Sequence, residues 1–249
     1  MSVVDVVVIL VGGFFAGVIN SMAGGGSLIT VPLLSLAGVG GTLANGSNRV
    51  AILAQNASSA WGFARKGVGA WSQTVPVLAP AVVGSLIGSL VASRIDDRLF
   101  ERLFGFLMLP LLVLSLRSKP PTDGGKKAWP LWATVIAFFG VGLYGGAVQA
   151  GVGILMLLVL ARAGFDLVTA NGIKVLTNLA ITCIALPVFI LNGQVRWLPA
   201  IVLSAGMAVG GFTGAHVAVE GGERVIRPVL VVVVLVLASR MLGLWDLFS

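Results

Sequence analysis

The sequence predicts an all-α polytopic membrane protein, made of two inverted repeats of about five helical segments each. Of its 249 residues, 57% are hydrophobic and only 10% are charged, whereas a soluble domain needs far more charge to cover its surface. Apolar stretches of the roughly 20 residues that cross a bilayer recur along the whole chain. In addition, Asn45-Gly46 recurs as Asn171-Gly172, which indicates that one membrane unit is present twice.

The offset between Asn45 and Asn171, 126 residues, also relates other positions of the chain. The matching pairs include Ala37-Gly38 with Ala163-Gly164, Trp71 with Trp197, Gly84 with Gly210 and Gly88 with Gly214. Transporters built from two such copies place their substrate site where the copies meet. The two Asn-Gly pairs are therefore the first candidates for function.

Each half contains five apolar segments. In chain order they are 3–22, 28–36, 43–63, 71–92 and 99–116 in the first half, and 129–148, 154–161, 168–191, 197–219 and 225–244 in the second. The polar stretch 117–128 contains Pro120-Pro121 and Gly124-Gly125, which are typical of a linker. We therefore expect a first membrane repeat at 1–116, a cytoplasmic linker at 117–128 and a second membrane repeat at 129–249.

The second segment of each half, 28–36 or 154–161, is too short to cross a bilayer as a helix. Each follows a cluster of glycines, and each glycine disfavours helix by about 1 kcal/mol. We expect a hairpin that turns near the membrane centre in each half, where irregular backbone survives only if protein or a wet cavity satisfies it. Close helix packing through glycine is the alternative. The four-spaced Gly84/Gly88 and Gly206/Gly210/Gly214 suit that packing role and are assigned to the scaffold.

Loop charges predict the orientation. Arg65-Lys66 and the linker 117–128 are net positive, and positive loops face the cytoplasm. Both termini then lie outside. Because three of the five segments in each half certainly cross, an odd number, the two halves have opposite orientations, and their hairpins enter from opposite sides.

Two cations lie in the apolar segments, one shortly after each Asn-Gly pair: Arg49 and Lys174. Lys174, Thr177 and Asn178 share one helical face by their spacing. Charges inside a bilayer usually line a cavity or find a partner, and no acidic residue lies near either cation in sequence. Cations, amides, glycine-turn N–H groups and helix N-termini near Asn45 and Asn171 would together form an anion site.

Two simpler interpretations remain open. Arg49 and Lys174 would snorkel to the interface if they lay near helix ends, and Asn45 and Asn171 would be helix N-caps only. The expected substrate-binding residues are Asn20, Ser21, Gly24, Gly25, Gly26, Asn45, Arg49, Gln149, Gly151, Gly153, Asn171, Lys174, Thr177 and Asn178.

Other chemistry has little support in the sequence. We find no metal-ligand spacing, catalytic triad, phosphate loop or dinucleotide fingerprint, so we expect neither an enzyme nor a cofactor. The net charge of +7 lies in short loops and does not indicate nucleic acid. Cys183, the one cysteine, is expected to be a small buried hydrophobe. His216 is either a proton relay or, more commonly for such a position, a structural histidine.

The motifs resemble one known family. The first-half motif runs from Gly17 through Asn20-Ser21 and Gly24-Gly25-Gly26, and continues at Ala44-Asn45-Gly-Ser-Asn-Arg49. Together with Gly151-Val-Gly153 and Ala170-Asn171-Gly-Ile-Lys174, it is similar to the sulfite exporter TauE/SafE family. The resemblance implies a multi-pass permease of the bacterial inner (plasma) membrane. It also implies sulfur-containing or organic anions as substrates, such as sulfite, sulfonates or sulfoacetate.

These observations favour a secondary transporter that exports a small anion. An anion leaving a cell with a negative interior gains about 2.3 kcal/mol per 100 mV, so no further driving ion is required. An uptake permease and an anion channel for the same anions remain the alternatives. The expected partners are the small anionic substrate and the lipid bilayer, with a homo-oligomer possible.

Overall fold

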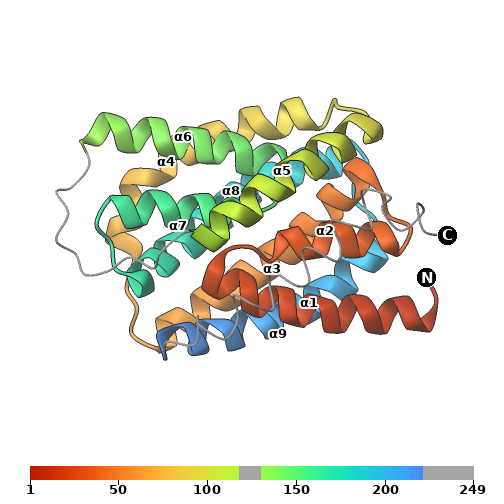
Figure 1. The fold of residues 1–249 in the computed structure, drawn as a ribbon, viewed down its shortest axis with the longest axis horizontal. Helices are drawn as coiled ribbons and strands as arrows, with labels where there is room; N and C mark the ends of the chain where they lie inside the picture. The colour runs from red at the N-terminus through yellow and green to blue at the C-terminus, as the bar shows by residue number, and fades with distance from the viewer. Residues whose placement is uncertain (118–129, 221–249) are drawn as a thin grey trace.

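The computed structural model describes residues 1–117 and 130–220, and this part of the chain is all helical (Figure 1). The helices are α1 (Val3–Ala23), α2 (Ser27–Leu36), α3 (Gly41–Arg65), α4 (Trp71–Ala92), α5 (Asp97–Arg117), α6 (Leu131–Ala147), α7 (Val152–Arg162), α8 (Leu167–Leu191) and α9 (Trp197–Val219). The all-α prediction is confirmed for these residues. Arg117 is the last residue of α5. The remainder of the expected linker and the expected segment 225–244 lie outside the described residues.

Within the described ranges, four helices, α1, α4, α8 and α9, are long and apolar enough to cross a membrane. Helix α3 is also long, with 25 residues, but it is much more polar. Most of its polar side chains, among them Asn45, Arg49 and Gln55, are buried against its neighbours. A polar helix is stable at membrane depth under these conditions, because protein and not lipid surrounds its polar groups.

The predicted glycine breaks are present in both halves. Helix α1 ends at Ala23, and Gly24 follows in the left-handed region with a φ of 76°. Helix α6 ends at Ala147, and the chain turns through Gln149 (φ 65°) and Gly151 (φ 68°) before α7 begins. In Figure 1 the α1–α2 hairpin opens toward the right and the α6–α7 hairpin toward the left. Inverted copies would have this arrangement, although the inverted relation itself stays a prediction.

Helices of one half pack against helices of the other half. Helix α1 packs along α9, and α4 packs along α6. A Cβ added at Gly210 of α9 would lie 2.9 Å from the carbonyl carbon of Phe14, and one at Gly88 of α4 would lie 2.9 Å from that of Leu143. The four-spaced glycines therefore let these backbones touch, and their assignment to the scaffold is confirmed.

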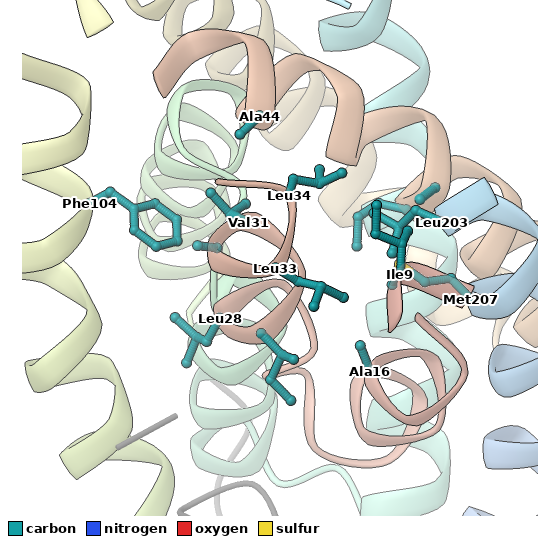
Figure 2. Close-up of a cluster of buried hydrophobic side chains, with 14 of the residues drawn as sticks. Ile9, Ala16, Leu28, Val31, Leu33, Leu34, Ala44, Phe104, Leu203 and Met207 are labelled. Atoms are coloured by element: carbon teal, nitrogen blue, oxygen red, sulfur yellow. The ribbon is translucent and has the colours of Figure 1, made fainter. Parts of the chain in front are cut away.

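The short helix α2 is enclosed by helices from both halves. Leu28, Val31 and Leu34 of α2 belong to an apolar cluster with Ile9 of α1 and Met207 of α9 (Figure 2). Eight of the ten residues of α2 are buried. This packing keeps the first helix break away from lipid, as the exposed backbone of a break requires.

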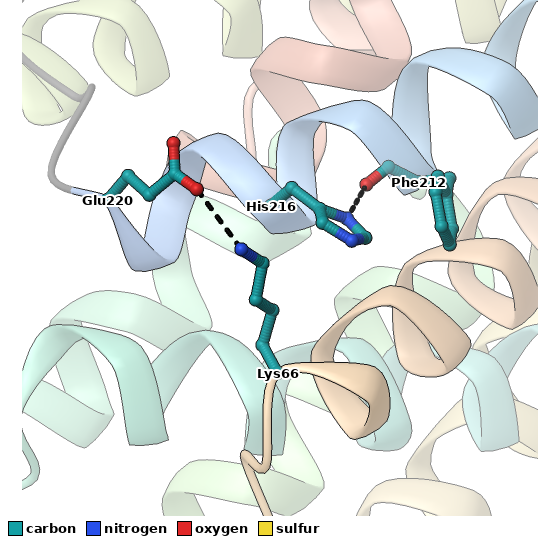
Figure 3. A network of polar contacts seen from close by, with 4 residues as sticks. All are labelled: Lys66, Phe212, His216 and Glu220. Atoms are coloured by element: carbon teal, nitrogen blue, oxygen red, sulfur yellow. Dashed lines mark hydrogen bonds and ion pairs between the residues drawn. The ribbon is translucent and has the colours of Figure 1, made fainter.

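Two side chains on the periphery bear on earlier expectations. His216 lies near the end of α9, where its Nδ1 is 2.9 Å from the carbonyl oxygen of Phe212 on the same helix (Figure 3). This contact is what a structural histidine would make.

Cys183 is exposed on α8, so the expectation that it is buried was wrong. Its neighbours in sequence face the interior, while position 183 lies on the outer face of the helix, where a small apolar side chain meets lipid at no cost.

Candidate functional site

The two asparagines of the repeated Asn-Gly motif lie inside helices and are not N-caps. Helix α3 begins at Gly41 after the N-cap Gly40, and α8 begins after the N-cap Asp166. The expectation that the helices begin near Asn45 and Asn171 was therefore wrong by about one turn. The start of α3 is held instead by Asp97, whose Oδ1 accepts from the Thr42 N–H at 2.8 Å. The positive end of the α3 dipole therefore faces Asp97 at the start of the helix.

The two motif glycines contact loops of the opposite half. A Cβ at Gly46 would lie 2.9 Å from the carbonyl carbon of Gln194, in the loop between α8 and α9. A Cβ at Gly172 would lie 2.9 Å from the Cβ of Ala70, next to the start of α4. Each Asn-Gly pair therefore has its glycine against the other half's loop, which leaves the asparagine to point elsewhere.

The asparagine side chains take part in the polar interior. Asn45 donates from Nδ2 to the carbonyl oxygen of Ala147 at 2.9 Å, at the end of α6. Asn171 accepts at Oδ1 from Nζ of Lys174 at 2.6 Å. Both contacts lie beside a helix break, Asn45 at the break of the second half and Asn171 at that of the first.

Arg49 is fully buried and binds the end of α6. Its Nη2 donates to Gly146 O at 2.6 Å, and its Nη1 donates to Gly145 O at 3.1 Å and to Gln149 Oε1 at 3.1 Å. The guanidinium carbon lies 4.3 Å from the ring centre of Phe189. Carbonyls at a helix C-terminus lack helical partners and carry the negative end of the dipole. Arg49 satisfies both needs, and its 0% exposure excludes snorkelling.

Lys174 makes the corresponding contacts at the other break. Only 2% of it is exposed, and its Nζ donates to Asn20 O and Ser21 O at 2.8 Å each. These carbonyls end α1. The cation of each half therefore holds the broken helix of the other half, a reciprocal arrangement that supports the predicted meeting of the two copies.

The two helix breaks touch through backbone. A Cβ at Gly24 would lie 2.6 Å from Gly153 Cα, and one at Gly153 would lie 2.5 Å from Gly24 Cα. No side chain fits between them. The predicted glycines thus bring the two hairpin turns into direct contact, close to the residues that hold both cations.

Gln149 links Arg49 to α8. It is fully buried and is the only non-glycine residue with a positive φ among residues 1–117 and 130–220. Its Oε1 accepts from Arg49, and its Nε2 donates to Asn178 Oδ1 at 2.8 Å. A left-handed backbone costs a residue with a Cβ about 1–2 kcal/mol. Strain of this kind is concentrated at functional sites.

A second polar cluster lies beside Lys174. Asn20 Nδ2 donates to Gln55 Oε1 at 2.6 Å, and Gln55 Nε2 donates to Ser21 Oγ at 2.9 Å and to Ser59 Oγ at 2.8 Å. Gln55 and Ser59 were not among the expected site residues. Their spacing of four on an otherwise buried helix is the signal that could have identified them.

Several buried polar atoms have no partner in the described part of the chain. Around the breaks they are Asn45 Oδ1, Asn48 Nδ2, Arg49 Nε and Thr177 Oγ1. An unsatisfied buried group costs about 1–3 kcal/mol, so these atoms are candidates for contacts with water or ligand. Asn48 Nδ2 and Arg49 Nε are the nitrogen donors among these atoms.

The structure thus connects most of the expected site residues by direct contacts. The exceptions are two glycines, one asparagine and one threonine. Gly26 packs against Asn20, whereas Gly151 packs against Leu111, and Gly25 is buried in the first break. Asn45 donates to Ala147 O, and the Thr177 hydroxyl has no partner among the described residues. No group of three His, Cys, Asp or Glu side chains that could hold a metal occurs within residues 1–117 and 130–220.

Comparison with known proteins gives one family and several relatives. The family described as Sulfite exporter TauE/SafE matches residues 9–241. "Probable membrane transporter protein ORF9" of Sinorhizobium sp is 28% identical over 94% of this chain and 91% of its own length. "Probable membrane transporter protein" of Haemophilus influenzae is 28% identical over 92% and 91%, and "Probable membrane transporter protein YfcA" of Escherichia coli K12 is 28% identical over 91% and 86%. No solved structure matches the chain.

Proposed function

Because this chain belongs to the sulfite exporter TauE/SafE family of membrane transporters, we propose that it exports a small sulfur-containing or organic anion, of the sulfite or sulfonate class, across the bacterial inner membrane. The observation that carries the proposal is the reciprocal placement of the two buried cations. Arg49 of the first half holds the break after α6, and Lys174 of the second half holds the break after α1. Positive charge at a junction of broken helices is what an anion carrier needs.

In this proposal the anion binds where the two breaks meet. Arg49 Nε and Asn48 Nδ2 donate to it, because both are buried nitrogen donors that lack a partner among the described residues. Backbone N–H groups contribute as well, since Gly25, Gly26 and Ser27 precede the first internal bonds of α2. The positive end of the α2 dipole favours a negative ligand at the same place. Asn45, Asn171, Thr177 and Asn178 shape the polar wall around it.

Lys174 and Arg49 together neutralise the charge of the anion inside the bilayer. Without a counter-charge, an ion at this depth would cost several kcal/mol. Alternating access then requires the α1–α2 hairpin and the α6–α7 hairpin to move relative to the opposite half. Their contact at Gly24 and Gly153 is the natural pivot, because only backbone touches backbone there.

Transport by purified protein in liposomes tests the proposal. We expect Arg49→Ala and Lys174→Ala to abolish sulfite or sulfonate movement while both variants still insert. Arg65→Ala is the matched control, because Arg65 ends the same helix α3 but is exposed and stacks on Trp61. Normal anion transport by both site variants would show that the two cations are not part of the site.

A binding measurement supplies the substrate class. Sulfite, sulfonates and carboxylates are titrated while thermal unfolding of the purified protein is followed, since a ligand of the folded state stabilises it increasingly above its Kd. Stabilisation of wild type but not of Arg49→Ala by one class identifies that class. If no anion stabilises wild type, the anion proposal is wrong. Measuring the direction of anion movement under an imposed potential, negative inside or reversed, separates export from uptake. An anion flux far above carrier turnover would indicate a channel.

A further inference from the structure

We propose that the oxygen cage around the Lys174 ammonium is a monovalent-cation site, and that Lys174 fills it with a tethered cation in place of a free coupling ion such as Na⁺. The proposal deepens the function proposed above, because it assigns one of the two cations a task distinct from contacting the anion. Its main test, thermal unfolding, needs no substrate anion, so the outcome of that test is independent of whether the anion proposal holds.

The cage has the composition of a cation site. Three oxygen atoms, Asn20 O, Ser21 O and Asn171 Oδ1, lie 2.6–2.8 Å from Nζ. An ammonium has three N–H donors, and each of these three oxygens accepts from it. All three oxygens are neutral, and two are backbone carbonyls at the end of α1. The negative end of the α1 dipole adds attraction for any cation placed there.

Broken helices elsewhere provide this same chemistry for free ions. In inverted-repeat transporters, unwound backbone carbonyls and the C-terminal ends of half-helices coordinate Na⁺ near the bilayer midplane. Here the corresponding carbonyls of α1 are occupied by a side chain from α8, 153–154 residues away in sequence. The cage is therefore filled whenever the two halves are assembled.

Arg49 differs from Lys174 in a way that supports the division of tasks. Its planar guanidinium binds Gly145 O, Gly146 O and Gln149 Oε1, and its Nε remains without a partner among the described residues. Arg49 thus holds its helix break and keeps a donor for an anion. We infer that direct anion contact falls to Arg49, and that Lys174 supplies the charge that a coupling ion would otherwise bring.

Deleting the ammonium while keeping the cage tests the proposal. Thermal unfolding of Lys174→Ala is measured without any substrate anion, in chloride salts of Na⁺, K⁺, methylammonium or choline at equal ionic strength. We expect a lower Tm than wild type in choline, and a rise in Tm with at least one of the three smaller cations as its concentration increases. Wild type should have the same Tm in all four salts.

Two matched variants sharpen the result. Lys174→Met fills most of the same volume without a charge, so it should lose stability and show no rescue by a cation. Lys66→Ala removes a lysine that is partly exposed and paired with Glu220, and it should show no cation selectivity. Rescue of Lys174→Ala alone supports the cage. Equal Tm values for Lys174→Ala in all four salts overturn the proposal.

A measurement on wild type keeps the proposal falsifiable if Lys174→Ala does not fold. Anion transport in liposomes is compared in sodium and in choline buffers. An unchanged rate supports a tethered cation, whereas a rate that falls to background without sodium overturns it.

Discussion

Replacing Gly24 by alanine tests whether the two helix breaks touch. The added Cβ would lie 2.6 Å from Gly153 Cα and 2.7 Å from Ile154 N, whereas ordinary contacts begin at 3.4 Å. The carbonyl carbon of Gly153 would be closer still, so one backbone must move by more than about 0.8 Å, and overpacking of this kind costs about 1–3 kcal/mol. The φ of 76° at Gly24 adds about 1–2 kcal/mol for any residue with a Cβ. We expect a total loss of about 2–5 kcal/mol.

Gly67→Ala is the matched control for this change. Gly67 has the same φ of 76°, but a Cβ there would meet nothing within 4 Å. It should lose only the backbone contribution, about 1–2 kcal/mol. The difference between the two variants isolates the contact between the breaks, and it corresponds to about 2–12 °C in Tm for a chain of this size. Equal unfolding temperatures for Gly24→Ala and Gly67→Ala would refute direct contact between the breaks.

Three further predictions concern packing, capping and charge. Gly142→Ala should destabilise the fold, because its Cβ would lie 2.7 Å from the carbonyl carbon of Ala81. A Cβ at Gly140 on the same helix would meet open space, so Gly140→Ala should stabilise the fold by up to about 1 kcal/mol. Thermal unfolding should therefore show Tm shifts of opposite sign for the two variants. Asp166→Ala removes an N-cap that accepts from Val168 and Thr169 and should cost about 1 kcal/mol. Burial acts to raise the pKa of Asp166, but these hydrogen bonds outweigh burial and lower that pKa. The stabilisation by the carboxylate is therefore complete above the unfolded pKa and is lost as pH falls through the folded pKa. The Tm difference between wild type and Asp166→Ala should accordingly shrink on acidification. Lys66→Ala should change Tm little, because an exposed ion pair with Glu220 contributes at most about 1 kcal/mol.

The helices could be predicted well because their signals are local. The expected segments 71–92 and 197–219 coincide with α4 and α9, since apolar length and the tryptophan at each start define them. The breaks followed from clustered glycines. The start of α3 was misplaced because the Thr42 N–H is satisfied by Asp97, which lies 55 residues later than Thr42. A window of sequence around Asn45 carries no sign of that partner.

The candidate site was only partly predictable. Arg49 and Lys174 stood out because charge is rare in apolar segments, but their acceptors are mostly backbone carbonyls, which every residue possesses. Only the three-dimensional path of the chain decides which backbone carbonyls lie at a helix end and are left to bind a side chain. The sequence therefore indicated that the cations are important, and it carried no signal that each would bind the opposite half.

The reciprocal contacts also order events during biosynthesis. Arg49 leaves the ribosome 96 residues before Gly145, and Asn20 leaves 154 residues before Lys174. At about 5–20 residues per second, the guanidinium waits about 5–20 s for its acceptors. In that interval it must be sheltered by the insertion machinery, by water or by lipid phosphates. A nascent chain that stops short of α6 therefore carries an intramembrane charge without its acceptors.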